Sequence, residues 1–231
     1  MSHYEKAWQA VKARIAQAAR MAGRSPDEVT LTAVSKTFAP EAVRAVHALG
    51  QRIFAENYVQ EGVAKRQALA DLADIEWRLV GPLQANKTGV AAQAFNAVES
   101  VDRLRIAERL SAQRGDDLPP LEVLIQVNIS SEVTKSGVAP GDALALARQV
   151  AALPRLRLAG FMGIAAPGAD PGEQRRQFRQ LRDCLVRARS EGLALESLSM
   201  GMSADLEAAV AEGSTEVRIG SAIFGGRKGS P

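Results

Sequence analysis

Strand-length apolar runs alternate with helical periods along this 231-residue chain, and this alternation restricts the possible folds more than any other feature. The apolar runs fall at 29–36, 52–57, 75–81, 96–101, 122–129, 156–164, 196–200 and 216–224. Helical periods lie near 40–49, 59–70, 84–94, 102–113, 140–153, 172–190 and 204–212, and an amphipathic helix precedes them over 4–22. Strands that alternate with helices form parallel sheets.

Eight strand–helix units in a chain of this length predict an α/β fold, a (β/α)8 (TIM) barrel with an extra N-terminal helix, because such barrels typically take about 250 residues. A doubly wound open sheet is the alternative. Local signals support the boundaries: Gly23 follows the first helix, 25–28 has capping-box spacing, and Pro140 is placed to open a helix. No repeat or low-complexity linker divides the chain, so we expect residues 1–231 to form one domain.

Composition excludes several classes of protein. The 29 basic and 26 acidic residues are interspersed, without a basic stripe, so a nucleic-acid partner is not expected. The single cysteine, Cys184, rules out an internal disulfide and suits a reducing compartment, which predicts a cytoplasmic location. No apolar run approaches the roughly 20 residues that span a bilayer, so no membrane partner is expected. The two histidines, His3 and His47, lie far apart, and no cluster has metal-ligand spacing.

Lys36 is the residue that is best placed to take part in a chemical reaction. It ends the first predicted strand, and Pro40 soon opens a helix. The carboxyl ends of barrel strands are where ligands bind, and desolvation lowers the pKa of an amine and makes it a Schiff-base nucleophile. A lysine that merely reaches into solvent is the alternative.

The last two strands carry small and hydroxyl residues suited to phosphate. Ser199, Gly201 and Ser203 precede a predicted helix, and Gly220-Ser221 repeats the theme on the last strand. Backbone N–H groups can approach an anion there, and barrels often bind phosphate after strands 7 and 8. Ser203 as a simple helix N-cap is the alternative.

Arg218 lies two residues before Gly220, so alternation places it on the same inner face, one step deeper. A buried arginine needs an acceptor, which a carboxylate such as Glu216 or the nitrogen of a bound pyridine ring would supply. A lysine for an aldehyde, a phosphate site and a donor for a ring nitrogen together describe pyridoxal 5′-phosphate (PLP).

Seven segments, in the same order along the chain, resemble those of the pyridoxal-phosphate homeostasis proteins, also called the proline synthetase co-transcribed family. They are AVSKT at 33–37, AENYVQE at 55–61, GPLQANK at 81–87, QVNI at 126–129, KSG at 135–137, LSMGMSAD at 198–205 and VRIGSAIFG at 217–225. The chain departs from the family at Arg78, where a histidine is usual after the tryptophan, and more mildly at Ala55 and Ser221.

The resemblance implies a fold-type III barrel like the N-terminal domain of alanine racemase. It implies that Lys36 forms the internal aldimine with PLP and that Arg218 contacts the pyridine nitrogen. It implies that Ser199, Ser203, Gly220 and Ser221 hold the phosphate and that Asn57 and Met162 flank the cofactor. It implies no catalytic residue. A monomer is expected, with PLP-dependent apo-enzymes as recipients of the cofactor.

An arginine opposite the ring nitrogen favours binding over catalysis, because it only donates and leaves that nitrogen unprotonated. The sequence therefore predicts a non-catalytic carrier or buffer of PLP in the cell. A small PLP-dependent racemase or lyase is the alternative; racemisation needs a second base, a role for which Tyr58 is the candidate, although a rim position is the simpler interpretation. A barrel enzyme that acts on a phosphorylated sugar without PLP is the third possibility.

Overall fold

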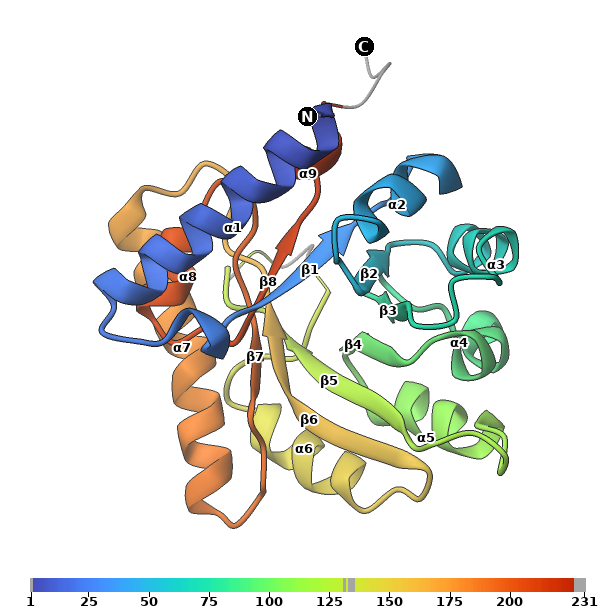
Figure 1. Cartoon of the computed structure of the whole chain (residues 1–231). Helices are drawn as coiled ribbons and strands as arrows, with labels where there is room; N and C mark the ends of the chain where they lie inside the picture. The colour runs from blue at the N-terminus through green and yellow to red at the C-terminus, as the bar shows by residue number, and fades with distance from the viewer. Residues whose placement is uncertain (1, 131, 133–135, 227–231) are drawn as a thin grey trace.

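The eight predicted strands form one closed parallel barrel in the computed structural model of the chain, which describes residues 2–130, 132 and 136–226 (Figure 1). The strands are β1 (Thr30–Val34), β2 (Ile53–Glu56), β3 (Glu76–Leu79), β4 (Ala97–Val101), β5 (Leu121–Val127), β6 (Leu156–Gly163), β7 (Ser197–Ser199) and β8 (Glu216–Ile219). They follow sequence order, and β1 pairs with β8 through the register Thr32 to Arg218. This closure confirms the TIM barrel and excludes the open sheet.

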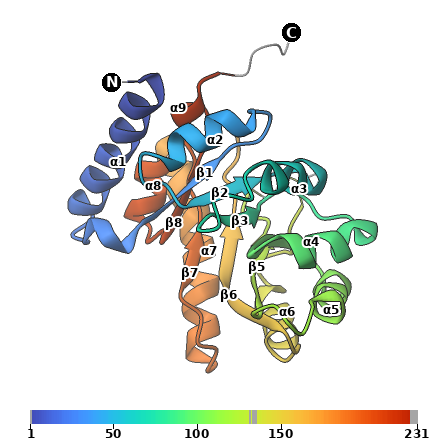
Figure 2. The same ribbon diagram turned by 45° about the vertical axis from the view of Figure 1, so that its right-hand side comes forward.

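Helices cover the outside of the barrel, as Figures 1 and 2 show. They are α1 (His3–Met21), α2 (Pro40–His47), α3 (Val59–Ala68), α4 (Thr88–Ala94), α5 (Leu104–Gln113), α6 (Ala143–Ala151), α7 (Pro171–Ser190), α8 (Leu206–Ala211) and α9 (Ser221–Phe224), with 3-10 turns η1 (Pro26–Glu28) and η2 (Ala85–Lys87). No helix in the described part of the chain is long and apolar enough to cross a membrane.

Local sequence signals explain where the first elements begin and end. The hydroxyl of Ser2 caps α1 and Glu5 completes its capping box, while Gly23 takes the left-handed φ of +70° that lets the chain leave the helix. Ser25 and Glu28 form the predicted capping box on η1. The chain thus turns from α1 directly into the first strand.

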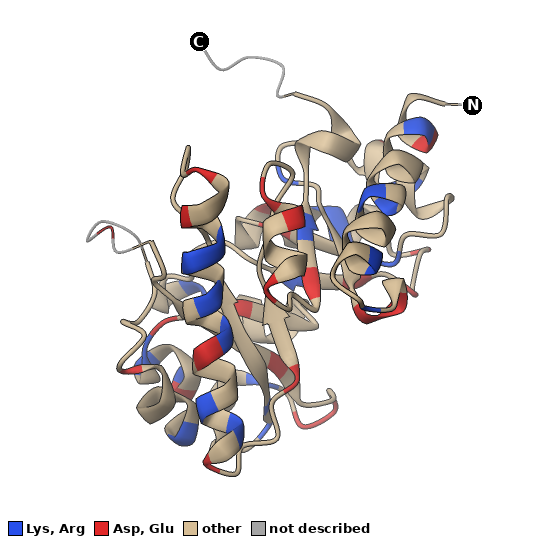
Figure 3. Ribbon diagram, turned by 90° about the vertical axis from the view of Figure 1, so that its left-hand side faces the viewer, with Lys and Arg blue, Asp and Glu red and all other residues tan. Residues whose placement is uncertain are grey.

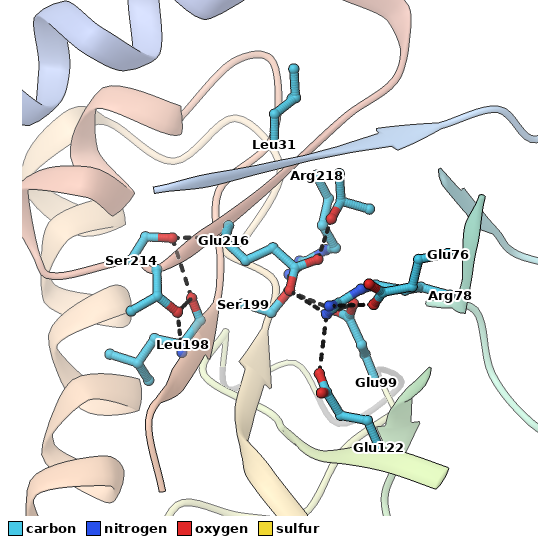
Figure 4. A network of polar contacts seen from close by, with 12 residues as sticks. Leu31, Glu76, Arg78, Glu99, Glu122, Leu198, Ser199, Ser214, Glu216 and Arg218 are labelled. Atoms are coloured by element: carbon cyan, nitrogen blue, oxygen red, sulfur yellow. Dashed lines mark hydrogen bonds and ion pairs between the residues drawn. The ribbon is translucent and has the colours of Figure 1, made fainter. Parts of the chain in front are cut away.

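The hydrophobic core has two parts. The larger part lies between the strands and the surrounding helices and includes Phe54, Ile106 and Phe178. The smaller part lies inside the barrel, where Leu124, Ala159 and Met162 pack together. Charged side chains occupy much of the remaining barrel interior, whereas branched apolar side chains fill this space in most TIM barrels (Figure 4).

The N-terminal helix α1 packs on the barrel, as predicted. Val11, Ile15, Ala18 and Ala19 form its buried face, and it contacts α8 and α9 (Figure 1). On the side of the molecule seen in Figure 3, positively and negatively charged residues are mixed along the helices. The charges that the sequence predicted to be interspersed are therefore interspersed on these helices.

Several predicted boundaries are wrong, among them the end of β8, the start of α6 and the end of β1. Strand β8 ends at Ile219, and residues 221–224 form α9 instead of continuing the strand. Helix α6 begins at Ala143, so Pro140 lies in the turn before it. Strand β1 ends at Val34, so Lys36 lies two residues beyond it, in a turn.

Cys184 lies on the buried face of α7 and is only 8 % exposed. Burial raises the pKa of its thiol to about 11, so the thiol is protonated at neutral pH. Cys184 thus serves as a packing residue of α7. No group of three or more potential metal ligands occurs among the residues that the structure describes.

Candidate functional site

A cavity of about 350 Å³ opens at the carboxyl ends of the barrel strands. Six of the eight predicted site residues line it: Lys36, Asn57, Ser203, Arg218, Gly220 and Ser221. A second cavity of about 380 Å³, beside α1 and the start of β1, contains none of them. Because TIM barrels bind their ligands at the carboxyl ends of the strands, we place the site in the first cavity.

The turn that carries Lys36 is fixed on both sides. Before it, the Ser35 hydroxyl donates to Glu56 Oε1 at 2.5 Å, and the Ser35 carbonyl accepts from Lys65 Nζ at 2.5 Å. After it, the Thr37 N–H donates to Glu61 Oε1 at 2.5 Å. Thr37 has a φ of +69°, which is uncommon for a β-branched residue, so these contacts hold a strained backbone next to Lys36.

Lys65 joins the two carboxylates beneath this turn. Its Nζ lies 2.7 Å from Glu56 Oε1 and 2.8 Å from Glu61 Oε1, and both Lys65 and Glu56 are buried. Burial raises the pKa of Glu56, and the ammonium of Lys65 opposes that rise. A buried ion pair of this kind fixes the geometry of the turn.

Asn57 follows β2 at the wall of the cavity, and Gly81 holds it there. A Cβ at position 81 would lie 2.2 Å from the Asn57 carbonyl oxygen, so only glycine allows the ends of β2 and β3 to come this close.

Arg218 enters the cavity from β8 and is 4 % exposed. Its Nη1 donates to Ser199 Oγ at 2.7 Å, and its Nη2 donates to the Gly163 carbonyl at 2.9 Å. Glu216 pairs with Arg78 instead, at 2.8 Å. The acceptors of the buried Arg218 are thus neutral groups.

Two predicted site residues, Ser199 and Met162, do not line the cavity. Ser199 is fully buried, and its hydroxyl donates to Glu99 Oε2 at 2.5 Å while it accepts from Arg218. Met162 packs inside the barrel, where Ile164 separates it from the cavity. Both lie one layer deeper than the predicted position at the mouth.

The small residues after β7 and β8 meet at one end of the cavity. The Ser221 hydroxyl donates to Ser203 Oγ at 3.4 Å. Helix α8 begins at Leu206 with Asp205 as its N-cap residue, so Ser203 is not a cap and lies in the loop before it. Arg14 of α1 donates to the Ser203 carbonyl at 3.2 Å, so the N-terminal helix supports this loop.

Sequence reasoning missed the charged group inside the barrel. Figure 4 shows Arg78 of β3 surrounded by carboxylates from four strands. The atoms of its guanidinium lie 2.6 Å from Glu76, 2.8 Å from Glu216, 3.3 Å from Glu122 and 3.5 Å from Glu99. The departure at Arg78 was the only sequence signal, because these carboxylates look like isolated strand residues until the barrel closes.

Lys135, part of one family segment, lies outside the described residues.

Comparison with family models gives a match over residues 7–228 to the alanine racemase N-terminal domain. Among curated proteins, the chain is 54 % identical over 217 residues to a pyridoxal phosphate homeostasis protein of Pseudomonas aeruginosa, covering 94 % of this chain and 93 % of that one. It is 48 % identical to the protein of the same name in Escherichia coli, covering 94 % of each.

Solved structures agree with these matches. PipY of Synechococcus elongatus with PLP bound superposes with a TM-score of 0.80 at 37 % identity, covering 91 % of this chain and all of that one. An alanine racemase from Corynebacterium glutamicum shares 19 % identity, a TM-score of 0.67 and the barrel fold, and this chain covers only 60 % of it.

Proposed function

This chain belongs to the pyridoxal phosphate homeostasis protein family, and on that premise we propose that it binds PLP and takes part in PLP homeostasis as a carrier or buffer. One observation carries the proposal: a single cavity at the strand ends brings together Lys36, Arg218 and the small residues of positions 203, 220 and 221. The proposal thus depends on residues at or just beyond the carboxyl ends of β1, β7 and β8.

The residues present fit the chemical groups of PLP. Lys36 is an amine for the aldehyde, Arg218 a permanent donor for the pyridine nitrogen, and the end at Ser203 and Ser221 supplies hydroxyls and small residues for the phosphate. The two cationic side chains in the lining also suit an anionic ligand. Asn57 lines the wall between the Lys36 turn and the Gly81 turn, where it would flank the ring.

Lys36 Nζ would hold PLP through its aldehyde carbon. The amine would supply the nucleophile for a condensation that releases the carbonyl oxygen as water, so no oxidant or reductant would be needed. The contacts of Ser35 and Thr37 hold the backbone on either side of the lysine, which limits how far the reacting atom can move.

We further propose that binding, rather than turnover, is the role of the site. In the described lining of the cavity, Lys36 and Arg218 are the titratable side chains, and neither is a second base on the far side of a bound ring. Tyr58 is 61 % exposed and lies outside that lining. The relatives' names describe homeostasis and not a reaction. We place this carrier in the cytoplasm as a monomer that hands PLP to apo-enzymes.

The absorption spectrum before and after borohydride reduction tests covalent binding. We expect a visible band after addition of PLP, a reduced adduct mapped to Lys36, and loss of both in Lys36→Ala. The matched control, Lys6→Ala, removes an exposed lysine of α1 and leaves the spectrum unchanged. A wild-type protein that takes up no PLP would overturn the proposal.

Proton exchange separates a carrier from an enzyme. The PLP-loaded protein is incubated in deuterated water with a panel of amino acids, and NMR follows the α-proton. A carrier gives no exchange beyond that of free PLP, whereas steady exchange that Lys36→Ala abolishes would identify the racemase or lyase alternative.

A further inference from the structure

We propose that Ser199 and Glu99 are positioning residues for Arg218, and that Arg78 is the buried cation that holds Glu99 in place for this task. The inference rests on the proposed function, because it concerns how Arg218 is presented to a ligand in the cavity. Figure 4 shows the side chains as a continuous network through the barrel interior.

The direction of the hydrogen bonds in this network is determined. A guanidinium only donates, so Ser199 Oγ must accept from Arg218 Nη1 at 2.7 Å. The hydroxyl proton of Ser199 is then directed to Glu99 Oε2, 2.5 Å away. The carboxylate of Glu99 therefore fixes the hydroxyl, and the hydroxyl fixes the guanidinium.

Arg218 is held on its inner side by two acceptors, Ser199 and the Gly163 carbonyl. A guanidinium has five N–H donors, so these contacts leave others for a group in the cavity that Arg218 lines. Fixed donors bind a planar acceptor better than mobile ones, because no reorientation is needed when the ligand arrives.

Arg78 supplies the positive charge at the far end of the network. Its Nη1 lies 3.5 Å from Glu99 Oε1 and 2.8 Å from Glu216 Oε2. Burial and the neighbouring Glu99 carboxylate raise the pKa of Glu216 to about 8, so the Glu216 carboxyl group is mostly protonated at neutral pH. The histidine that is usual at this position in the family would lose its charge near neutral pH. Arg78 keeps its charge at every physiological pH.

A purely structural role does not account for this arrangement. Buried ion pairs contribute little net stability, and apolar side chains of similar size often replace them without loss. The network instead ends at the one buried arginine that lines the cavity, which is the arrangement expected of a positioning device.

The test compares Ser199→Ala and Glu99→Gln with Thr32→Val. Thr32 belongs to the same interior, where its hydroxyl donates to Glu216, but it is not part of the path from Glu99 to Arg218. The dissociation constant for PLP and the absorption spectrum of bound PLP are measured for each variant from about pH 6 to pH 9, together with the unfolding midpoint of the unloaded protein.

We expect Ser199→Ala and Glu99→Gln to weaken PLP binding at least about tenfold, a change of about 1.4 kcal/mol, and to shift the spectrum of the bound cofactor. Thr32→Val keeps both properties, and so does Ser199→Thr, which retains the hydroxyl. Borohydride still links PLP to Lys36 in every variant. Ser199→Ala adds no bulk, so it decides the matter if Glu99→Gln does not fold.

Two negative outcomes are distinguishable. If the wild type captures PLP on Lys36 and both test variants keep its affinity and spectrum, the positioning role is wrong while the proposed function stands. If the wild type does not capture PLP, the proposed function itself fails. A lower unfolding midpoint with unchanged affinity and spectrum identifies a structural role and also overturns the inference.

Discussion

Arg78 is a single buried guanidinium in contact with four carboxyl groups. Three of them, Glu99, Glu122 and Glu216, come from other strands of the barrel, at sequence separations of 21 to 138 residues. Removing the cation leaves buried negative charges without a partner, which costs far more free energy than the ion pairs contribute when intact.

We expect Arg78→Met, which retains most of the side-chain volume, to lower the free energy of unfolding by about 3–5 kcal/mol. Urea unfolding followed by circular dichroism measures the change. Arg44→Met is the matched control, because the ion pair of Arg44 with Asp71 is exposed and contributes little. Equal effects of the two substitutions would contradict the assigned role of Arg78.

Glu216 gives the stability of the protein a pH dependence with a definite sign. Its pKa is raised from 4.5 to about 8, chiefly by burial and next by Glu99. Between those pH values the folded state binds a proton that the unfolded state has lost, so the free energy of unfolding falls as the pH rises. The stabilisation is complete below the lower pKa and is lost as the pH passes the upper one.

Glu216→Gln removes this titrating group. We expect the free energy of unfolding of the variant to vary less with pH than that of the wild type, by a few kcal/mol over the whole window, since each pKa unit corresponds to about 1.4 kcal/mol. Urea titrations at about pH 5, 6.5 and 8 give the two slopes. Parallel slopes would show that Glu216 does not take up the proton.

At the scale of elements, the ends of β2 and β3 approach each other more closely than side chains allow. The Gly81 backbone lies against Asn57, and Asn57 lines the candidate site. This contact determines how far the wall of the cavity is from the turn that carries Lys36.

Gly81→Ala introduces a methyl group that must displace the Asn57 backbone. We expect a loss of about 3 kcal/mol in the free energy of unfolding, the upper end of overpacking penalties, and weaker PLP binding because Asn57 moves. Gly141→Ala is the matched control, since a Cβ at position 141 meets nothing within 4 Å. Its stability is expected within about 0.5 kcal/mol of the wild type, and PLP binding that survives in Gly81→Ala would contradict the argument.

Elements were predicted well where their periodicity is long and poorly where it is short. Eight strands and the amphipathic α1 followed from the sequence pattern. The run 222–224 is too short to distinguish a strand from a helix by period, so the turn into α9 at Ser221 was missed. Helix α6 begins after Asp142 instead of at Pro140, because a β-turn occupies the residues between.

At the scale of the whole molecule, barrel closure joins every strand to two neighbours, and α1 packs on the closing elements. The two tryptophans lie in different parts of this assembly, Trp8 in α1 and Trp77 in β3. Such a structure has no edge from which one part unfolds alone.

The variants Trp8→Phe and Trp77→Phe leave one fluorescent reporter each. We expect the midpoint of urea unfolding from tryptophan fluorescence to coincide with that from circular dichroism in each variant, because the barrel and α1 unfold together. An earlier fluorescence midpoint in Trp77→Phe, where Trp8 alone reports, would show that α1 detaches first.

Six of the eight predicted site residues line the candidate cavity because they lie at strand ends, which the sequence pattern locates; their roles toward PLP stay predictions. Lys36, Asn57, Ser203, Arg218, Gly220 and Ser221 meet in one cavity as expected. Ser199 and Met162 do not line this cavity, because both residues lie one layer deeper than the mouth, inside the barrel. The partners of Arg78 were not predictable, since no local pattern records which carboxylates face one another across a closed barrel.

The pairing of β1 with β8 has a consequence for synthesis on the ribosome. Lys36 leaves the ribosome long before Arg218 and Ser221, and all three residues line the cavity. A nascent chain that lacks β8 has a lysine without a pocket around it, and domains fold as their strands become available. The complete candidate site for PLP therefore arises only after β8 has been made, and a product truncated before β8 lacks this site.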